Sequence, residues 1–346
     1  MWKDLRKTKW LLSLPDTPEA RVPLREVLQH QVEAMRRARG EGPPEADSTL
    51  DEGQLFVAQQ HGFRDWAHAL AYSEDRIDRR FEAAADAVVT GNRVALEALL
   101  AEDPNLARAR SAYGHHATLI HHVAANGVEA ARQWSLPNAP EMARVLLAAG
   151  ADPDAGSNSY GGTCVTTLCL LVSSSHPADA GVQADLVEVL CRGGAKPNGL
   201  EDEGLPLWTA ITSGYTRSAQ RLVACGARVD NPITAAALGD LALLKSYFGE
   251  DGRLIPMREL RGERFFSRGR PFDASHLLEY ALSYAAFHGR RDAVEFLLSK
   301  NPDLSVKEPA HGSTAVGMAK YPHHRSEGRP GGSPDIVALL EDRMRT

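Results

Sequence analysis

Two glycine-ended segments that lie close together constrain the fold of this chain more than any other feature. The first runs from Thr118 to Gly127, and the second runs from Met142 to Pro153 and contains Gly150-Ala151-Asp152. Apolar residues at helical spacing predict a helix in each segment, and the glycines can adopt the left-handed conformation that ends a helix. The two segments therefore predict a pair of short helices, with Gly127 closing the first one.

The same pattern recurs along the chain from residue 81 to residue 343. Counting the pair above, seven copies of the first helix are predicted, the others over 82–91, 166–171, 205–214, 230–239, 280–289 and 314–319. Their partner helices are predicted over 95–100, 186–190, 219–223, 241–248, 293–298 and 336–340. A recurring unit of this kind predicts a stack in which each repeat packs against its neighbours.

The copies resemble one family of repeats. The segment Thr118-Leu119-Ile120-His121 and the Gly-Ala-Asp ending are similar to the ankyrin repeat, whose signature includes T-P-L-H-x-A. Leu205-Pro206-Leu207-Trp208 keeps the proline and the leucine, with Trp208 at the histidine place. The resemblance implies an all-α ankyrin-repeat solenoid of about seven helix-turn-helix repeats over residues 81–346. It also implies that His121 makes a structural hydrogen bond to a neighbouring loop backbone.

Residues 1–80 do not show the repeat and are predicted to form an N-terminal helical cap region. Helices are expected over 21–39 and 50–60, and a third begins near Asp65. The segment 58–66 looks like the helical lead-in found before ankyrin repeats in some bacterial proteins. A solenoid needs a cap over its first repeat, and Phe63 and Trp66 are the expected buried anchors.

Insertions lengthen several repeats beyond the ankyrin period of about 33 residues. They fall at 128–138, 174–182, 249–275 and 321–333. Three of them lie between the two helices of a repeat, so we expect them to project from one edge of the stack. Insertions of this kind often carry the binding surface.

The composition of the chain limits the classes of partner and the cellular compartment that we expect. The net charge of −6 argues against a DNA partner bound through overall charge. The apolar segment 10–14 is too short for a signal peptide or a membrane span, so no membrane partner is expected. The four cysteines lack C-x-x-C spacing, which indicates reduced thiols in a cytoplasmic protein.

Histidines gather around the second repeat, at His115, His116, His121, His122 and His176. Three or four of them converging could bind a metal ion, although adjacent side chains on a helix point about 100° apart. In the ankyrin resemblance, His122 takes a variable place that faces the concave groove. We expect either partner contact or plain exposure for His122, and we assign no metal ligand.

The resemblance places the partner-binding surface on the variable positions of the first helices and on the finger loops. Tyr113 and Tyr160 precede the first helices of successive repeats, where each either contacts the partner or packs against its own loop. Tyr284 and Phe287 are the expected interface anchors. The full predicted set is Tyr113, His116, His122, Asn126, Tyr160, Ser173, Ser174, Thr209, Thr212, Ser213, Tyr284, Phe287 and His288.

The insertion 249–275 is rich in arginine. Arg258, Arg261, Arg264 and Arg268 are candidates for contact with an anion, the alternative being that they are merely solvated.

The phosphate-binding, dinucleotide-binding, zinc-protease and serine-hydrolase motifs do not occur in the sequence. We therefore predict a non-enzymatic scaffold that recognises a protein or peptide through the concave ankyrin groove, with no cofactor. The alternative is an enzyme, or a protein that binds a small molecule or metal, built on the same frame. It would use the His, Cys and Tyr residues between 113 and 176.

Overall fold

The computed structural model describes residues 65, 78–113, 115–129, 132–159, 165–257, 260–262, 270–321 and 332–345. The chain divides into two compact units, Met1–Thr167 and Leu168–Thr346, here called unit 1 and unit 2. Nearly all of the predicted cap region, including Phe63 and Trp66, lies outside the described residues.

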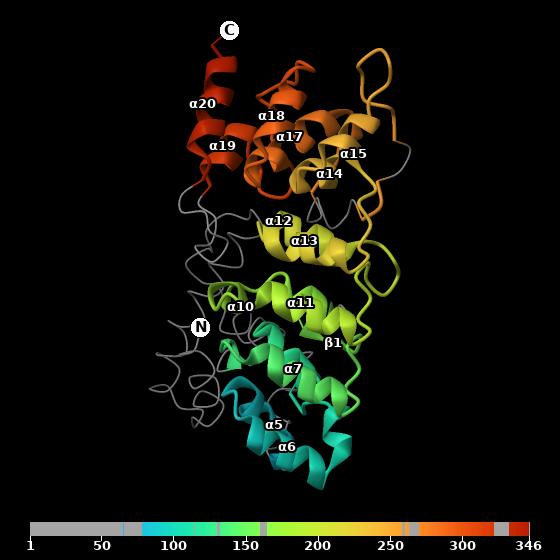
Figure 1. Cartoon of the computed structure of the whole chain (residues 1–346), viewed down its shortest axis with the longest axis vertical. Helices are drawn as coiled ribbons and strands as arrows, with labels where there is room; N and C mark the ends of the chain where they lie inside the picture. The colour runs from blue at the N-terminus through green and yellow to red at the C-terminus, as the bar shows by residue number, and fades with distance from the viewer. Residues whose placement is uncertain are drawn as a thin grey trace. The chain divides into compact units, whose positions relative to one another are not determined.

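Unit 1 contains the first two helix pairs. The first pair is α5 (Arg79–Val89) with α6 (Arg93–Glu102), followed by the 3₁₀ helix η2 (Pro104–Ala107). The second pair is the 3₁₀ helix η3 (Leu119–Ala124) with α7 (Ala139–Ala148). Helix α5 packs on α6 (Figure 1) and on η3, and η3 packs on α7. The apolar face predicted for α5 is buried, because its alanines and valines fill the space between these helices.

The helices of the first pair begin where short polar side chains accept backbone hydrogen bonds. The Asp78 carboxylate accepts from the N–H groups of Arg80 and Phe81, and Asn92 Oδ1 accepts from Ala95 N–H. Such caps satisfy donors that the first turn of a helix leaves free.

The first helix of the second repeat is shorter than predicted. It is a 3₁₀ helix closed by bonds such as His121 N–H to Thr118 O, and it ends at Ala124. Ala125, with φ of 49°, takes the left-handed conformation that was expected of Gly127. The prediction that Gly127 closes the helix is therefore wrong, although Gly127 also has a positive φ of 70°.

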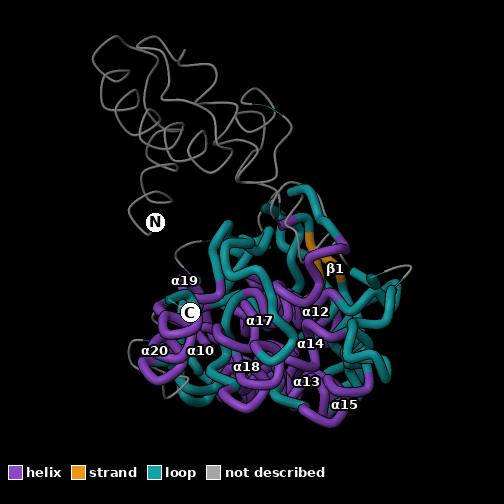
Figure 2. Tube along the Cα trace, turned by 90° about the horizontal axis from the view of Figure 1, so that it is seen from above, coloured by secondary structure: helices purple, strands orange, loops and turns teal. Residues whose placement is uncertain are grey.

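Short extended segments form the finger loops of unit 1. Strand β1 (Gly156–Ser157) pairs antiparallel with β2 (Val165–Thr166), and Gly156 lies opposite Thr166. An isolated antiparallel bridge joins Arg110 to Thr118 in the preceding finger. Figure 2 shows how little strand, drawn orange, accompanies the purple helices.

Unit 2 contains five further helix pairs in the described residues. The first helices are α9 (Thr167–Leu171), α12 (Leu205–Thr212), α14 (Pro232–Leu238), α17 (Leu277–Phe287) and α19 (Ala315–Lys320). Their partners are α11 (Gln183–Arg192), α13 (Thr216–Ala224), α15 (Leu241–Ser246), α18 (Arg291–Leu298) and α20 (Pro334–Arg343). The insertion 174–182 carries the short helix α10 (Ser175–Asp179), and the 3₁₀ helix η5 (Ala274–His276) precedes α17.

The pairs of unit 2 pack as neighbours in chain order. Helix α12 packs on α13, α14 packs on α17, and α17 packs on α18 and α19 (Figure 1). Gly239, with φ of 78°, ends α14 in the left-handed conformation predicted for the helix-ending glycines. Apart from the short strands and bridges, the described chain is a succession of helix pairs, which confirms the predicted all-α class.

Candidate functional site

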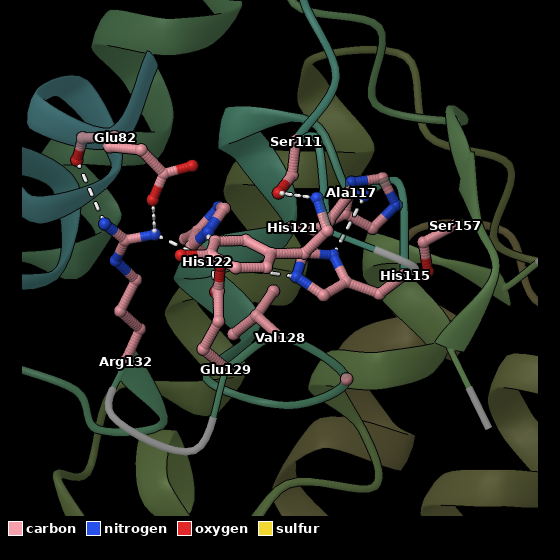
Figure 3. A network of polar contacts seen from close by, with 12 residues as sticks. Glu82, Ser111, His115, Ala117, His121, His122, Val128, Glu129, Arg132 and Ser157 are labelled. Atoms are coloured by element: carbon pink, nitrogen blue, oxygen red, sulfur yellow. Dashed lines mark hydrogen bonds and ion pairs between the residues drawn. The ribbon is translucent and has the colours of Figure 1, made fainter. Parts of the chain in front are cut away.

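A network of charged and polar side chains lies buried in the second repeat (Figure 3). Its centre is Glu129, which belongs to the insertion 128–138 and whose exposed fraction is 8%. His115 comes from the finger loop, His122 from η3 and Glu82 from α5. The network therefore joins the first repeat, the finger and the insertion.

Arg132 provides the positive charge of this network. Its Nη1 atom lies 2.6 Å from Glu82 Oε2 and 3.2 Å from Glu129 Oε1. Its Nε donates to Asp86 Oδ1 at 2.8 Å, and its Nη2 donates to the Glu82 carbonyl oxygen at 3.1 Å. Burial would lower the pKa of Arg132, but the carboxylates of Glu129 and Glu82 hold it above its usual range.

Two histidines face the Glu129 carboxylate from the other side. His115 Nδ1 accepts the Ala117 N–H, so in the neutral ring Nε2 carries the proton, and it lies 3.4 Å from Glu129 Oε1. His122 has an oxygen near each nitrogen, Thr118 O at 3.3 Å from Nδ1 and Glu129 Oε2 at 3.6 Å from Nε2. Burial would raise the pKa of Glu129, but the His115 and His122 rings beside its carboxylate hold it well below its usual range.

His121 is fully buried beside this cluster. Its Nδ1 accepts from the Thr118 N–H at 3.1 Å and lies 2.9 Å from Thr118 Oγ1. Burial lowers the pKa of His121 to about 3, and His122 and His115 add to the fall, while the Val165 backbone in the next finger opposes it. This burial suits the structural role that the resemblance implies for His121, although the hydrogen bonds of its Nδ1 atom go to Thr118 of its own repeat rather than to a neighbouring loop.

The geometry of the cluster suits cross-linking of elements better than ligation of a metal. A protonated His115 Nε2 is a donor and cannot coordinate an ion. No group of three or more His, Cys, Asp or Glu residues within the described ranges has the arrangement to hold a metal. His176 is exposed on α10 and does not join the cluster. Glu129 and Arg132 were missed at the sequence level, although two oppositely charged residues three apart in an insertion were a usable signal.

The predicted contact residues of unit 1 differ in exposure. His116 is exposed, Asn126 is half-buried, and Tyr113 is half-buried with its ring stacked on His115 at 6.1 Å between centroids. His122 is buried, so the expected exposure of this residue is wrong: Glu129 of the insertion lies 3.6 Å from its Nε2 atom, and the Phe81 ring packs edge to face against it. Tyr160 lies outside the described residues.

In unit 2 the expected exposure is correct for some predicted residues and wrong for others. Ser173 is exposed, and Thr209 and Ser213 are half-buried. Ser174, Thr212, Tyr284, Phe287 and His288 are buried, against expectation. The two predicted aromatic anchors contact each other edge to face, at 6.1 Å between ring centroids, within the core of α17 and its neighbours. Cys169 on α9 is also buried.

A buried carboxylate explains the burial of Tyr284. Glu308 Oε2 accepts from the Tyr284 hydroxyl at 3.0 Å and from Ala310 N–H at 2.9 Å. Its Oε1 accepts from His311 N–H at 2.8 Å and lies 3.3 Å from His311 Nδ1. Burial would raise the pKa of Glu308, but the contacts with His311 and Tyr284 hold it below its usual range. Sequence reasoning missed Glu308.

His288, which follows α17, contacts residues of the fourth repeat. Its Nε2 lies 3.0 Å from the Ile211 carbonyl oxygen, and its Nδ1 lies 2.8 Å from Thr216 Oγ1. A neutral ring satisfies both contacts, with Nε2 donating and Nδ1 accepting. The ring is therefore occupied internally.

The arginine-rich insertion folds back on the fourth repeat at Arg261. Its backbone carbonyl accepts from Trp208 Nε1–H at 2.9 Å, and its Nη1 lies 3.1 Å from Asp202 Oδ2. The candidate anion contact at Arg261 is thus already paired with carboxylates of the chain itself, Asp202 and Asp230. Arg258, Arg264 and Arg268 lie outside the described residues.

Comparison with known proteins adds a likeness of fold. No protein-family model matches the sequence, and no curated protein matches it. The structure is similar to that of the human ASB11 ankyrin repeat domain, with 17% sequence identity and a TM-score of 0.37 over 76% of this chain and 97% of that one. The repeat architecture rests on the helix pairs themselves. None of the described helices combines the length and the apolar run that crossing a membrane requires.

Proposed function

We propose that this chain is a non-catalytic scaffold that binds a partner protein or peptide. The observation that carries this proposal is the state of the insertion 128–138. Its charged side chains, Glu129 and Arg132, are used internally, whereas Trp134, two residues after Arg132, is exposed to solvent with an exposed fraction of 39%. Trp is among the residues in which interface energy concentrates.

The insertion is held on both sides of Trp134. Arg132 is bound to Glu82 and Asp86, and Gln133 Nε2 donates to the Val128 carbonyl oxygen at 2.7 Å. Asn138 Nδ2 donates to the Gly91 carbonyl oxygen at 2.9 Å. A Cβ at Gly91, whose φ is 65°, would lie 2.4 Å from Asn138 Oδ1, so this contact requires glycine. Because Arg132, Gln133 and Asn138 are held before binding, this part of the insertion loses less entropy when a partner arrives.

The predicted residues that are exposed or half-buried complete the proposed contact surface in each unit. They are Tyr113, His116 and Asn126 in unit 1, and Ser173, Thr209 and Ser213 in unit 2. The finer proposal, that they line a concave groove, follows from the ankyrin resemblance.

Capture of partners from extracts of the native host tests the proposal. Trp134→Ala should reduce capture of a specific partner about tenfold or more, the loss expected of an interface hot spot. Val94→Ala on α6, which truncates a side chain that is 78% exposed, is the matched control and should leave capture unchanged. Equal capture by the wild type and Trp134→Ala would remove the insertion from the contact surface. Absence of any specifically captured protein would contradict the scaffold role.

A further inference from the structure

A second polar region of unit 1 adjoins the buried network at Thr118, whose N–H and carbonyl oxygen face His121 and His122, and carries two exposed arginines that the network does not use. It is a cleft of about 470 Å³. Its walls come from the first finger and from the loop that follows α7. The lining residues are Arg108, Arg110, Thr118, Gly150, Ala151, Asp152, Pro153 and Ala155.

Both arginines of this cleft are held in place by carbonyl oxygens. Arg108 Nε donates to the Gly150 carbonyl oxygen at 2.8 Å. Arg110 Nη1 donates to the carbonyl oxygens of His116 at 2.8 Å and Gly156 at 2.6 Å. These contacts fix the direction of each guanidinium and leave its charge uncompensated.

The remaining donors have no partner within the described part of the chain. Arg108 makes no other hydrogen bond there, so its two terminal amino groups remain available, and Arg110 Nη2 is likewise unoccupied. Neither guanidinium forms an ion pair with a described carboxylate, in contrast to Arg132 and Arg261. Two oriented guanidinium groups in one cleft match the planar, two-oxygen shape of a carboxylate.

We propose that this cleft binds a carboxylate carried by an acidic side chain of a peptide. Asp152 also lines the cleft, so two positive charges face one negative charge, and the surplus matches a monoanion better than a doubly charged phosphate. The cleft volume is within the range of about 300–1,000 Å³ typical of ligand sites. The peptide as the source of the carboxylate rests on the proposed scaffold function.

Titration calorimetry on the purified full chain tests the cleft directly. The probe is a capped Gly-Glu-Gly peptide, compared with capped Gly-Gln-Gly and with inorganic phosphate. The glutamate peptide should bind, the glutamine peptide should bind about tenfold more weakly or not at all, and phosphate should bind more weakly than the glutamate peptide. Equal binding of the two peptides, or tighter binding of phosphate, would overturn the carboxylate assignment.

Substitutions locate the binding. Arg108→Gln should weaken glutamate-peptide binding about tenfold, a loss that fits one charge-assisted hydrogen-bonded pair. Arg144→Gln, an exposed arginine on α7 that does not line the cleft, removes the same charge and should leave affinity nearly unchanged. Equal affinities for these two variants would place the peptide elsewhere.

Asp152→Asn is expected to strengthen binding. A variant that merely fails to fold would weaken binding, so a gain cannot result from a folding defect. Removing the one carboxylate of the cleft should strengthen glutamate-peptide binding several-fold, and the amide oxygen can still accept the Asp154 N–H that Asp152 Oδ1 accepts. Asp292→Asn in unit 2 is the control for net charge and should not strengthen binding. No gain with Asp152→Asn would count against the cleft. Because these titrations need no cellular partner, the cleft and the scaffold role can fail independently.

Discussion

The chain buries a carboxylate in each unit, and the two are stabilised in different ways. Glu129 in unit 1 faces side chains, namely Arg132, His115 and His122. Glu308 in unit 2 accepts from backbone N–H groups of its own turn and from the Tyr284 hydroxyl, and the one basic side chain among these contacts is that of His311, three residues away. A carboxylate held by backbone donors orders one loop locally, whereas one held by charged side chains ties together segments that are distant in sequence. The comparison predicts that unit 1 depends more strongly on single side chains and on pH.

The largest effect should follow from removing the cation of the Glu129 network. Arg132→Met removes the guanidinium that pairs with the buried Glu129 and the half-buried Glu82 and leaves only the His115 and His122 rings beside Glu129, and we expect a loss of about 3–5 kcal/mol in the free energy of unfolding. Urea denaturation measures the loss, and hydrogen exchange should place it in unit 1. Arg93→Met is the matched control, because Arg93 pairs with Glu97 and Glu141 on an exposed face and should leave the midpoint almost unchanged. Similar midpoints for the two variants would show that the buried network adds no stability.

The second prediction concerns pH. His121 binds a proton near pH 6.5 when unfolded but only near pH 3 when folded, because it is buried close to His122, His115 and Arg110. Between these values the unfolded state holds more protons, so stability is lost as pH falls, by about 1.4 kcal/mol per pH unit. The pKa of Glu308 is lowered from 4.5, so its contribution is lost only below that value. At pH 5 unit 1 should therefore be destabilised by roughly 2 kcal/mol, before the contribution of Glu308 in unit 2 begins to be lost.

Hydrogen exchange at pH 7 and pH 5, corrected for intrinsic rates, separates the two units in this experiment. His121→Gln removes the titrating ring and should reduce the loss of protection around η3. Parallel loss of protection in both units, or an unchanged response in His121→Gln, would contradict the assignment to His121.

Much of the fold could be predicted from the sequence, because helix pairs are local. The glycines that end the first helices and the apolar spacing within helices such as α5 act over a few residues, and both indicate the repeat directly. The exposure of side chains could not be predicted in the same way. Tyr284 is covered by Glu308, which is 24 residues away, and Arg132 reaches Glu82 across 50 residues. The burial of these side chains depends on insertions and on contacts between residues distant in sequence. The repeat pattern describes only residues close together in sequence, so it cannot predict such contacts.

In the candidate site, too, features set by neighbouring residues could be predicted, and features set by distant residues could not. His121 takes the packing position that the ankyrin resemblance implies, whereas His122 is removed from the surface by Glu129 of the insertion. The arginine cleft was not foreseen, because it depends on where Gly150 and Gly156 place their carbonyl oxygens. The position of a backbone carbonyl oxygen cannot be read from the types of the residues.

The smallest expected effect concerns Tyr284, and it distinguishes a structural role of this residue from a role in partner contact. Tyr284→Phe keeps the ring in the core and removes the hydroxyl that donates to Glu308, and we expect a loss of about 1 kcal/mol, since backbone N–H groups still bind the carboxylate. Thermal unfolding measures the change, and partner capture by Tyr284→Phe should equal that of the wild type. A loss of capture with unchanged stability would restore the role in partner contact first expected of Tyr284. Unchanged capture with lower stability would show that the Tyr284 hydroxyl stabilises unit 2 through its hydrogen bond to Glu308.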